Sequence, residues 1–313
     1  MVVVRRLVVS PTLINSSSPW ASERDQLQEL FDSPYTGAIT TRTATLTGFR
    51  ETPEHTVALT NESISSVNSY GYSPHPLSTY VDYVNAILSS APDGSTKRVI
   101  ISITSSSPIS LACEGMTSRI GIELNTSCPN IKDSPPPAYN MSGLTPILDI
   151  LAQYFWKDPT LVIGLKLPPY IYSTQFDELS RRLNPFAFLT STNTLGQTLF
   201  FAEQVSLPPG KALPASDDVA APNGFALPTT LGGMAGEALH PLALGNVYTL
   251  RQLLDAHHDT SLRDITIIGV GGVTTRAAHA RMRRAGAAVV ACATILMHEG
   301  VSVFEKLSIT NEG

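Results

Sequence analysis

The stretch ITIIGVGG, residues 265–272, is an apolar run that ends in two glycines. A run without polar alternation is typical of a parallel strand that is covered on both faces. Seven further β-branched or apolar runs recur along the chain, each before a segment that could be helical: residues 37–43, 63–69, 98–104, 121–125, 161–167, 187–193 and 287–294. Eight such strands with helical connections predict an α/β fold, a (β/α)8 TIM barrel.

The segments between the runs support this prediction. In residues 75–90, apolar side chains recur at helical spacing: Leu77, Tyr80, Val81, Val84 and Leu88. An open doubly wound sheet is the alternative, but no G-x-G-x-x-G follows the first predicted strand. With no linker or internal repeat, we expect residues 1–313 to form a single domain. The stretch 203–231 is rich in Pro, Ala and Asp, and we expect it to form a long insertion loop on the top face of the barrel.

Composition narrows the class of protein. The chain has 313 residues, 42% of them hydrophobic and 15% charged, which suits a large core and argues against disorder. A net charge of −5 argues against a nucleic-acid partner. The three cysteines show no CxxC spacing and the seven histidines no HExxH pattern, so we expect neither disulfides nor a metal site. No window reaches the roughly 18 apolar residues of a membrane span, so we expect a soluble, cytoplasmic protein.

Polar residues gather where the predicted strands end. In a barrel, the carboxyl ends of the strands converge on one site. The side chains found there are Arg42, Thr43, Asn68, Asn125, Cys128, Asn130, Lys166, Asn193 and Thr194, followed by Gly271, Gly272, Ala293 and Thr294. Buried amides need hydrogen-bonding partners. Several asparagines with one lysine therefore indicate a site for a planar heterocycle, such as a nucleobase, a pyrimidine or a flavin.

Two of these residues suggest chemistry. Cys128 leaves its strand for a proline-rich loop, where a thiolate could act as a general base. Lys166 lies in an apolar strand; it either extends its amine to solvent or, if it points inward, needs an anion beside it. Cys113 and Cys292 are interpreted as small buried hydrophobic residues.

The two glycines at residues 271 and 272 suggest an anion site. They expose backbone N–H groups just before a predicted helix, and barrels often bind phosphate in the loops after strands seven and eight. The segment ACAT, residues 291–294, would supply the second half of this site.

Five segments resemble the class 1 dihydroorotate dehydrogenases, most nearly the cytosolic class 1A branch. They are ELNTSCPNIKDSPPPAYN (123–140), GLKLPPY (164–170), NTLG (193–196), GGMAGEALHPLALGNV (232–247) and IIGVGGVTTRAA (267–278). The likeness runs from about Ser10 to about Ser308. It implies an FMN-dependent oxidation of dihydroorotate to orotate, part of pyrimidine biosynthesis, with fumarate as the electron acceptor and a homodimeric enzyme.

The resemblance also implies roles for individual residues. Cys128 would take the C5 proton of the substrate, and Lys166 would stabilise the reduced flavin anion. Substrate-binding positions would be Arg42, Asn68, Tyr70, Gly71, Tyr72, Asn125, Asn130, Asn193 and Thr194. Cofactor-binding positions would be Ser17, Arg42, Thr43, Asn125, Lys166, Thr192, Gly236, Gly271, Gly272, Ala293 and Thr294.

Some residues depart from the family pattern. Arg42 stands where the family has lysine, Tyr70 and Tyr72 replace smaller apolar residues, and Ala293 replaces a glycine. These departures leave two alternatives open. One is an FMN-dependent oxidoreductase that acts on a different cyclic amide or enone-type substrate. The other, which a short third helix and a missing final helix suggest, is a barrel that binds a ligand without turnover.

Overall fold

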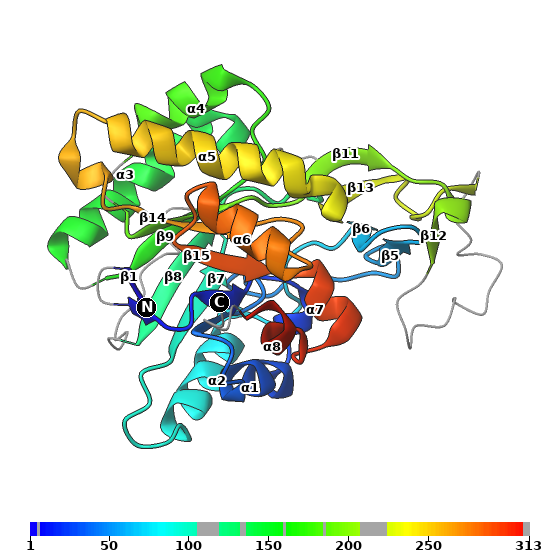
Figure 1. Cartoon of the computed structure of the whole chain (residues 1–313), viewed down its shortest axis with the longest axis horizontal. Coiled ribbons are helices and arrows are strands. Elements are labelled where there is room, and N and C mark those ends of the chain that lie inside the picture. The colour runs from blue at the N-terminus through cyan, green and yellow to red at the C-terminus, as the bar shows by residue number, and fades with distance from the viewer. Residues whose placement is uncertain are drawn as a thin grey trace.

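Eight parallel strands form the centre of the molecule (Figure 1). The computed structural model describes residues 1–4, 7–104, 119–131, 136–158, 161–183, 186–206 and 224–308. The strands are β3 (Leu13–Asn15), β4 (Ala38–Thr40), β7 (Arg98–Ile103), β8 (Ile120–Asn125), β9 (Ile163–Leu167), β10 (Phe188–Ser191), β14 (Thr266–Val270) and β15 (Val289–Cys292). Their order is β3-β15-β14-β10-β9-β8-β7-β4. The N–H of Gly37 donates to the carbonyl of Leu13 at 3.0 Å and links the two outer strands. The predicted (β/α)8 barrel is confirmed.

The prediction was wrong for the first two strands. The barrel begins at β3, which was missed, and the run 37–43 contains its second strand, β4. The run 63–69 contains β6 (Ser65–Asn68), which pairs antiparallel with its neighbours in a separate sheet. That sheet has the order β11 (Leu195–Leu199), β13 (Leu231–Gly236), β6, β5 (Val57–Thr60), β12 (Val205–Ser206). Three of the four residues of β6 are buried, as in a barrel strand, so its sequence alone could not separate the two sheets.

The five-stranded sheet lies at one end of the barrel, to the right in Figure 1. Its strands come from two connections, one between β4 and β7 and the other between β10 and β14. The predicted insertion loop 203–231 includes β12 and ends at β13, while residues 207–223 lie outside the described residues. β11 follows directly after β10, and β13 ends just before α5, so both lie in a connection that leaves the barrel at the carboxyl ends of its strands.

Helices cover the outside of the barrel (Figure 1). They are α1 (Arg24–Asp32), α2 (Leu77–Ser89), α3 (Met141–Lys157), α4 (Ser173–Ser180), α5 (His240–Ala256), α6 (Arg276–Arg284), α7 (Thr294–Glu299) and α8 (Val303–Leu307). Short 3-10 turns lie at η1 (Pro19–Ala21), η3 (Pro137–Tyr139), η4 (Ala202–Gln204), η7 (Glu237–Leu239) and η8 (Thr260–Leu262). The helix predicted within 75–90 is α2, which buries Tyr80, Val84 and Ile87 while Val81 faces outward.

In the part of the chain that the structure describes, no helix has the length and apolar character needed to cross a bilayer. The expected short third helix, in residues 107–119, and Cys113 fall outside the described residues, except for Arg119.

An N-terminal hairpin closes the end of the barrel opposite the site. Its strands are β1 (Val2–Val4) and β2 (Leu7–Val9), which pair antiparallel. Val4, Leu7 and Val9 belong to the same buried cluster as residues of the barrel interior such as Phe188. A Cβ added at Gly121, at the start of β8, would lie 2.6 Å from Leu7 Cδ1, which shows how closely the hairpin packs against the barrel. The carboxyl ends of the strands are therefore the end available for a ligand.

Candidate active site

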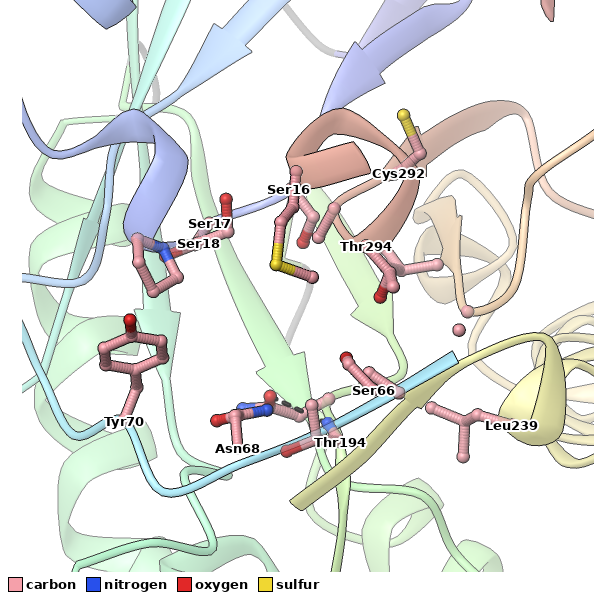
Figure 2. Close-up of a pocket in the computed structure, with 18 of the residues that line it drawn as sticks. Ser16, Ser17, Ser18, Ser66, Asn68, Tyr70, Thr194, Leu239, Cys292 and Thr294 are labelled. Atoms are coloured by element: carbon pink, nitrogen blue, oxygen red, sulfur yellow. Dashed lines mark hydrogen bonds between the residues drawn. The ribbon is translucent and has the colours of Figure 1, made fainter. Parts of the chain in front are cut away.

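One pocket opens among the carboxyl ends of the barrel strands, and the five-stranded sheet forms one of its walls (Figure 2). Its empty volume is about 1030 Å³, including the open mouth. Asn68 and Thr194 lie on one side of it, across from Ser17 and Thr294. The pocket is lined by every site residue predicted from the sequence: Ser17, Arg42, Thr43, Asn68, Tyr70, Gly71, Tyr72, Asn125, Cys128, Asn130, Lys166, Thr192, Asn193, Thr194, Gly236, Gly271, Gly272, Ala293 and Thr294.

Cys128 lies in this pocket, just beyond the end of β8. Burial raises the pKa of its thiol. A backbone hydrogen bond from Asn130, and then the charges of Lys166 and Arg42, act in the opposite direction but do not cancel the effect of burial. The thiol is therefore predominantly protonated at neutral pH and must lose its proton before it can act as a base.

Lys166 is buried near the end of β9, where it pairs in register with Asn125 of β8. Its ammonium donates to Ser16 Oγ at 3.3 Å and to the carbonyl of Ser17 at 3.4 Å, both long hydrogen bonds to neutral oxygens. Among the described residues, no carboxylate lies within 4 Å of it. Burial lowers its pKa, while the charges of Glu123 and then Cys128 raise it. A buried ammonium with such weak partners suits an anion in the pocket.

Glu123 is a buried carboxylate that the sequence reasoning did not select. It lies two residues before Asn125 on β8, so both side chains point to the same side of the strand. Ser102 Oγ donates to its Oε1 at 3.0 Å, and Thr190 Oγ1 donates to its Oε2 at 2.6 Å. The sequence did carry a signal for Glu123, because an acidic residue inside an apolar strand is unusual. Glu123 partly balances the charge of Lys166 from the interior of the barrel.

The amide groups of Asn125 and Asn193 are held by a hydrogen-bond network. Asn125 donates through Nδ2 to Thr43 Oγ1 at 3.0 Å and accepts through Oδ1 from the N–H and the hydroxyl of Ser127, both at 3.1 Å. Asn193 donates through Nδ2 to Ser127 Oγ at 3.0 Å, and its Oδ1 accepts from the N–H of Thr194 at 2.9 Å. Because these contacts fix the amide orientations in advance, a ligand need not order them.

A second network crosses from the Cys128 loop to the five-stranded sheet. Asn130 donates through Nδ2 to the backbone and side-chain oxygens of Asn68, at 3.1 and 3.0 Å, and to the carbonyl of Tyr70 at 2.9 Å. Asn68 in turn donates to the carbonyl of Gly233 at 3.0 Å. The sheet and the Cys128 loop are thereby joined over the pocket. This explains why amide side chains flank the cysteine in the sequence.

Arg42 occupies the pocket beside an aromatic wall. Its buried guanidinium forms an ion pair with Glu51 and lies 5.4 Å from the centre of the Tyr70 ring. Tyr70 contacts Trp20 edge to face.

Burial, followed by the charge of Cys128, raises the pKa of Tyr72 to about 12, so this phenol stays neutral next to the thiol. Trp20 and Glu51 were not selected from the sequence, which shows no motif at either position.

The loop after β14 has the backbone conformation of an anion site. Gly271 and Gly272 have φ values of 130° and 64°, and a Cβ at Gly272 would lie 2.7 Å from the carbonyl oxygen of Gly236. Within the described residues, the backbone N–H groups of Gly272, Val273 and Thr274 make no hydrogen bond to other backbone groups. These groups are available to a phosphate or carboxylate.

Fold and site together define an α/β-barrel enzyme with its pocket at the carboxyl ends of the strands. Residues 11–310 match the family model described as dihydroorotate dehydrogenase. The chain is 31% identical over 307 residues to a probable dihydroorotate dehydrogenase A (fumarate) of Streptococcus pneumoniae, covering 96% of this chain and 87% of the relative. It is 29% identical over 304 residues to a putative enzyme of the same name from Streptococcus equi, covering 95% and 86%. The chain belongs to the dihydroorotate dehydrogenase family.

Proposed function

We propose that this protein oxidises (S)-dihydroorotate to orotate with FMN as its cofactor and fumarate, which is reduced to succinate, as the electron acceptor. The observation that carries the proposal is that the buried Cys128 and Lys166 line a single pocket together with the predicted asparagines. Membership of the family and the names of its relatives support the reaction.

The residues of the pocket fit FMN. Lys166 offers a buried ammonium without a carboxylate within 4 Å among the described residues, and the 271–274 loop offers backbone N–H groups that no backbone acceptor takes. We assign Ser17, Thr43, Thr192, Gly236, Gly271, Gly272, Ala293 and Thr294 to cofactor binding, together with Arg42, Asn125 and Lys166. Bound FMN would supply the acceptor for the hydride that leaves C6 of the substrate.

The side chains of the protein perform the remaining steps. Asn68, Asn125, Asn130 and Asn193, with Thr194, hold the pyrimidine ring and its carboxylate. Cys128 accepts the C5 proton as the C5–C6 double bond forms, which is general-base catalysis. Because the thiol is buried, the charges of Lys166 and Arg42 help to stabilise its thiolate. Lys166 would hold a positive charge beside the bound cofactor and so stabilise an anionic form of it. The five-stranded sheet above the pocket helps to exclude water.

A second candidate keeps the cofactor but changes the substrate to another cyclic amide. The ion pair of Arg42 with Glu51 motivates this candidate, because it gives the only arginine among the proposed substrate-binding residues a carboxylate partner within the protein. Tyr70 and Tyr72 also line this end of the pocket.

The resemblance implies a homodimer in the cytoplasm, and the particle mass in solution tests the dimer.

A visible absorption spectrum tests the main proposal. Purified protein should carry the yellow absorption of FMN and lose it when dihydroorotate is added without oxygen. Addition of fumarate should then restore it. Protein that holds FMN but is not bleached by dihydroorotate would exclude this substrate and favour the second candidate. Protein that takes up no added FMN would leave a barrel without oxidoreductase activity.

A further inference from the structure

We propose that His240 is a positioning residue for the anion-binding loop of residues 271–274: its imidazole fixes the Gly271 carbonyl and thereby directs the loop N–H groups towards the phosphate of the cofactor. The inference rests on the part of the proposed function that concerns FMN. It is independent of which substrate is oxidised.

Two hydrogen bonds define the state of this imidazole. His240 is the first residue of α5 and is buried, with 7% of its surface exposed. Its Nδ1 lies 2.7 Å from the carbonyl oxygen of Gly271, and its Nε2 lies 3.2 Å from Nε of Arg281. A guanidinium only donates hydrogen bonds, so Nε2 must accept. The proton therefore sits on Nδ1, which donates to Gly271, and the imidazole is neutral.

The hydrogen bond to the Gly271 carbonyl sets the direction of the Gly272 N–H group. In a planar trans peptide, the carbonyl and the N–H point to opposite sides. Gly271 and Gly272 line the pocket, whereas His240 is absent from the pocket lining and lies behind them. With its carbonyl turned towards His240, the Gly271–Gly272 peptide directs its N–H away from His240 and towards the pocket. This N–H makes no hydrogen bond to the backbone of other described residues.

The loop packs closely against His240. A Cβ added at Gly272 would lie 2.6 Å from Cβ of His240. At the other end of the loop, Thr274 donates through Oγ1 to Glu237 Oε1 at 2.6 Å. Glu237 also accepts from the N–H of Ile64 at 3.2 Å, which ties it to the five-stranded sheet. Glu237 and His240, three residues apart in the stretch EALH, thus hold the two ends of the loop.

The test compares FMN with riboflavin, which lacks the phosphate. We would measure both dissociation constants by quenching of flavin fluorescence. His240→Leu removes the donor to Gly271 and should weaken FMN binding about tenfold to a hundredfold, as the loss of a buried hydrogen bond does, while riboflavin binding stays within about twofold. His240→Asn keeps a donor near the position of Nδ1 and should retain most of the FMN affinity. Arg281→Leu removes the group that orients the imidazole and should weaken FMN binding about two- to fivefold.

Matched controls separate this role from general damage. His258→Leu changes an exposed histidine beyond the other end of α5, and Arg284→Leu changes an exposed arginine of α6; both should leave the two affinities unchanged. The proposal is overturned if His240→Leu keeps the FMN-to-riboflavin ratio of the wild type, or if it weakens riboflavin as much as FMN. Wild-type protein that binds no FMN would overturn both this inference and the proposed function. Wild-type protein that binds FMN but is not reduced by dihydroorotate would remove only the substrate assignment.

Discussion

Neutralising Glu51 should make the pocket bind anionic ligands more tightly. Glu51 forms an ion pair with the buried Arg42, and the Glu51 side chain remains 31% exposed. In the variant Glu51→Gln, the guanidinium keeps its charge but loses its carboxylate partner. A ligand carboxylate near Arg42 would then no longer be repelled by Glu51 and would become the counter-charge.

The size of the effect follows from Coulomb's law. A ligand carboxylate on the far side of the guanidinium would lie about 8 Å from that of Glu51, where two unit charges at an effective dielectric constant of about 20 repel by about 2 kcal/mol. Because Glu51 is partly exposed, solvent screening reduces this to about 1 kcal/mol. We therefore expect Glu51→Gln to bind orotate about fivefold more tightly, since about 1.4 kcal/mol corresponds to a factor of ten.

The assay compares orotate with its methyl ester, which carries no charge. Both are titrated into the FMN-loaded protein while the flavin spectrum is recorded. Only orotate should gain affinity in Glu51→Gln. The variant should also melt at a lower temperature without ligand, because a buried charge has lost its partner, and orotate should recover more stability in it than in the wild type. Glu54→Gln changes an exposed residue of the same loop that forms no ion pair with any described residue, and it should alter the affinity for neither ligand. Equal changes for orotate and the ester, or weaker orotate binding, would refute the reasoning.

Three further predictions concern the catalytic pair and one buried histidine. Cys128→Ser should slow flavin reduction at neutral pH by about a hundredfold or more in stopped-flow experiments, and the wild-type rate should rise with pH because burial raises the thiol pKa; an unchanged rate would remove Cys128 from the mechanism. Lys166→Met should slow the same step by about a hundredfold without lowering the melting temperature, because it removes a buried charge; a normal rate would contradict its assigned role. Burial, followed by the charge of Arg283, lowers the pKa of His279, whose ring nitrogens have no hydrogen-bond partner among the described residues. His279 therefore binds a proton more tightly in the unfolded chain than in the folded one. Its contribution to the free energy of unfolding is fully present above pH about 6.5 and is lost as the pH falls through the lowered pKa of the folded state. In urea unfolding at several pH values, His279→Leu should reduce the fall in the free energy of unfolding at low pH. An unchanged fall would show that another group causes it.

The sequence predicted the later barrel strands well because each is a run of four to six residues, nearly all buried. It missed β3, a strand of three residues, and it assigned 63–69 to the barrel. Asn68 nevertheless lines the pocket. The reason is that the five-stranded sheet lies over the carboxyl ends of the strands, so the end of β6 and the ends of the barrel strands face the same space.

The partners of the site residues could not be predicted. Arg42 and Glu51 meet through a loop, His240 and Gly271 are 31 residues apart, and Lys166 reaches Ser16 across 150 positions. Such contacts depend on how the connections fold back over the barrel, and a single sequence carries no periodicity that reports this. The same limit applies to the pKa of Cys128: a cysteine between asparagines indicated a polar loop, whereas the folded chain buries the thiol.

The charges around the pocket are compensated unequally, and this inequality bears on which ligand groups bind best. Arg42 is paired with Glu51, and Arg281 lies behind the neutral imidazole of His240. Lys166 has only long contacts to neutral oxygens, and the 271–274 loop offers N–H groups without backbone acceptors. The positive charge is therefore only partly compensated, by Glu123, where the cofactor is proposed to lie, whereas beside Tyr70 the charge of Arg42 is paired with Glu51. It follows that the site should hold an anionic cofactor firmly while recognising its substrate mainly through amide hydrogen bonds, so that changing one asparagine of the network should affect substrate choice more than changing Arg42 to lysine.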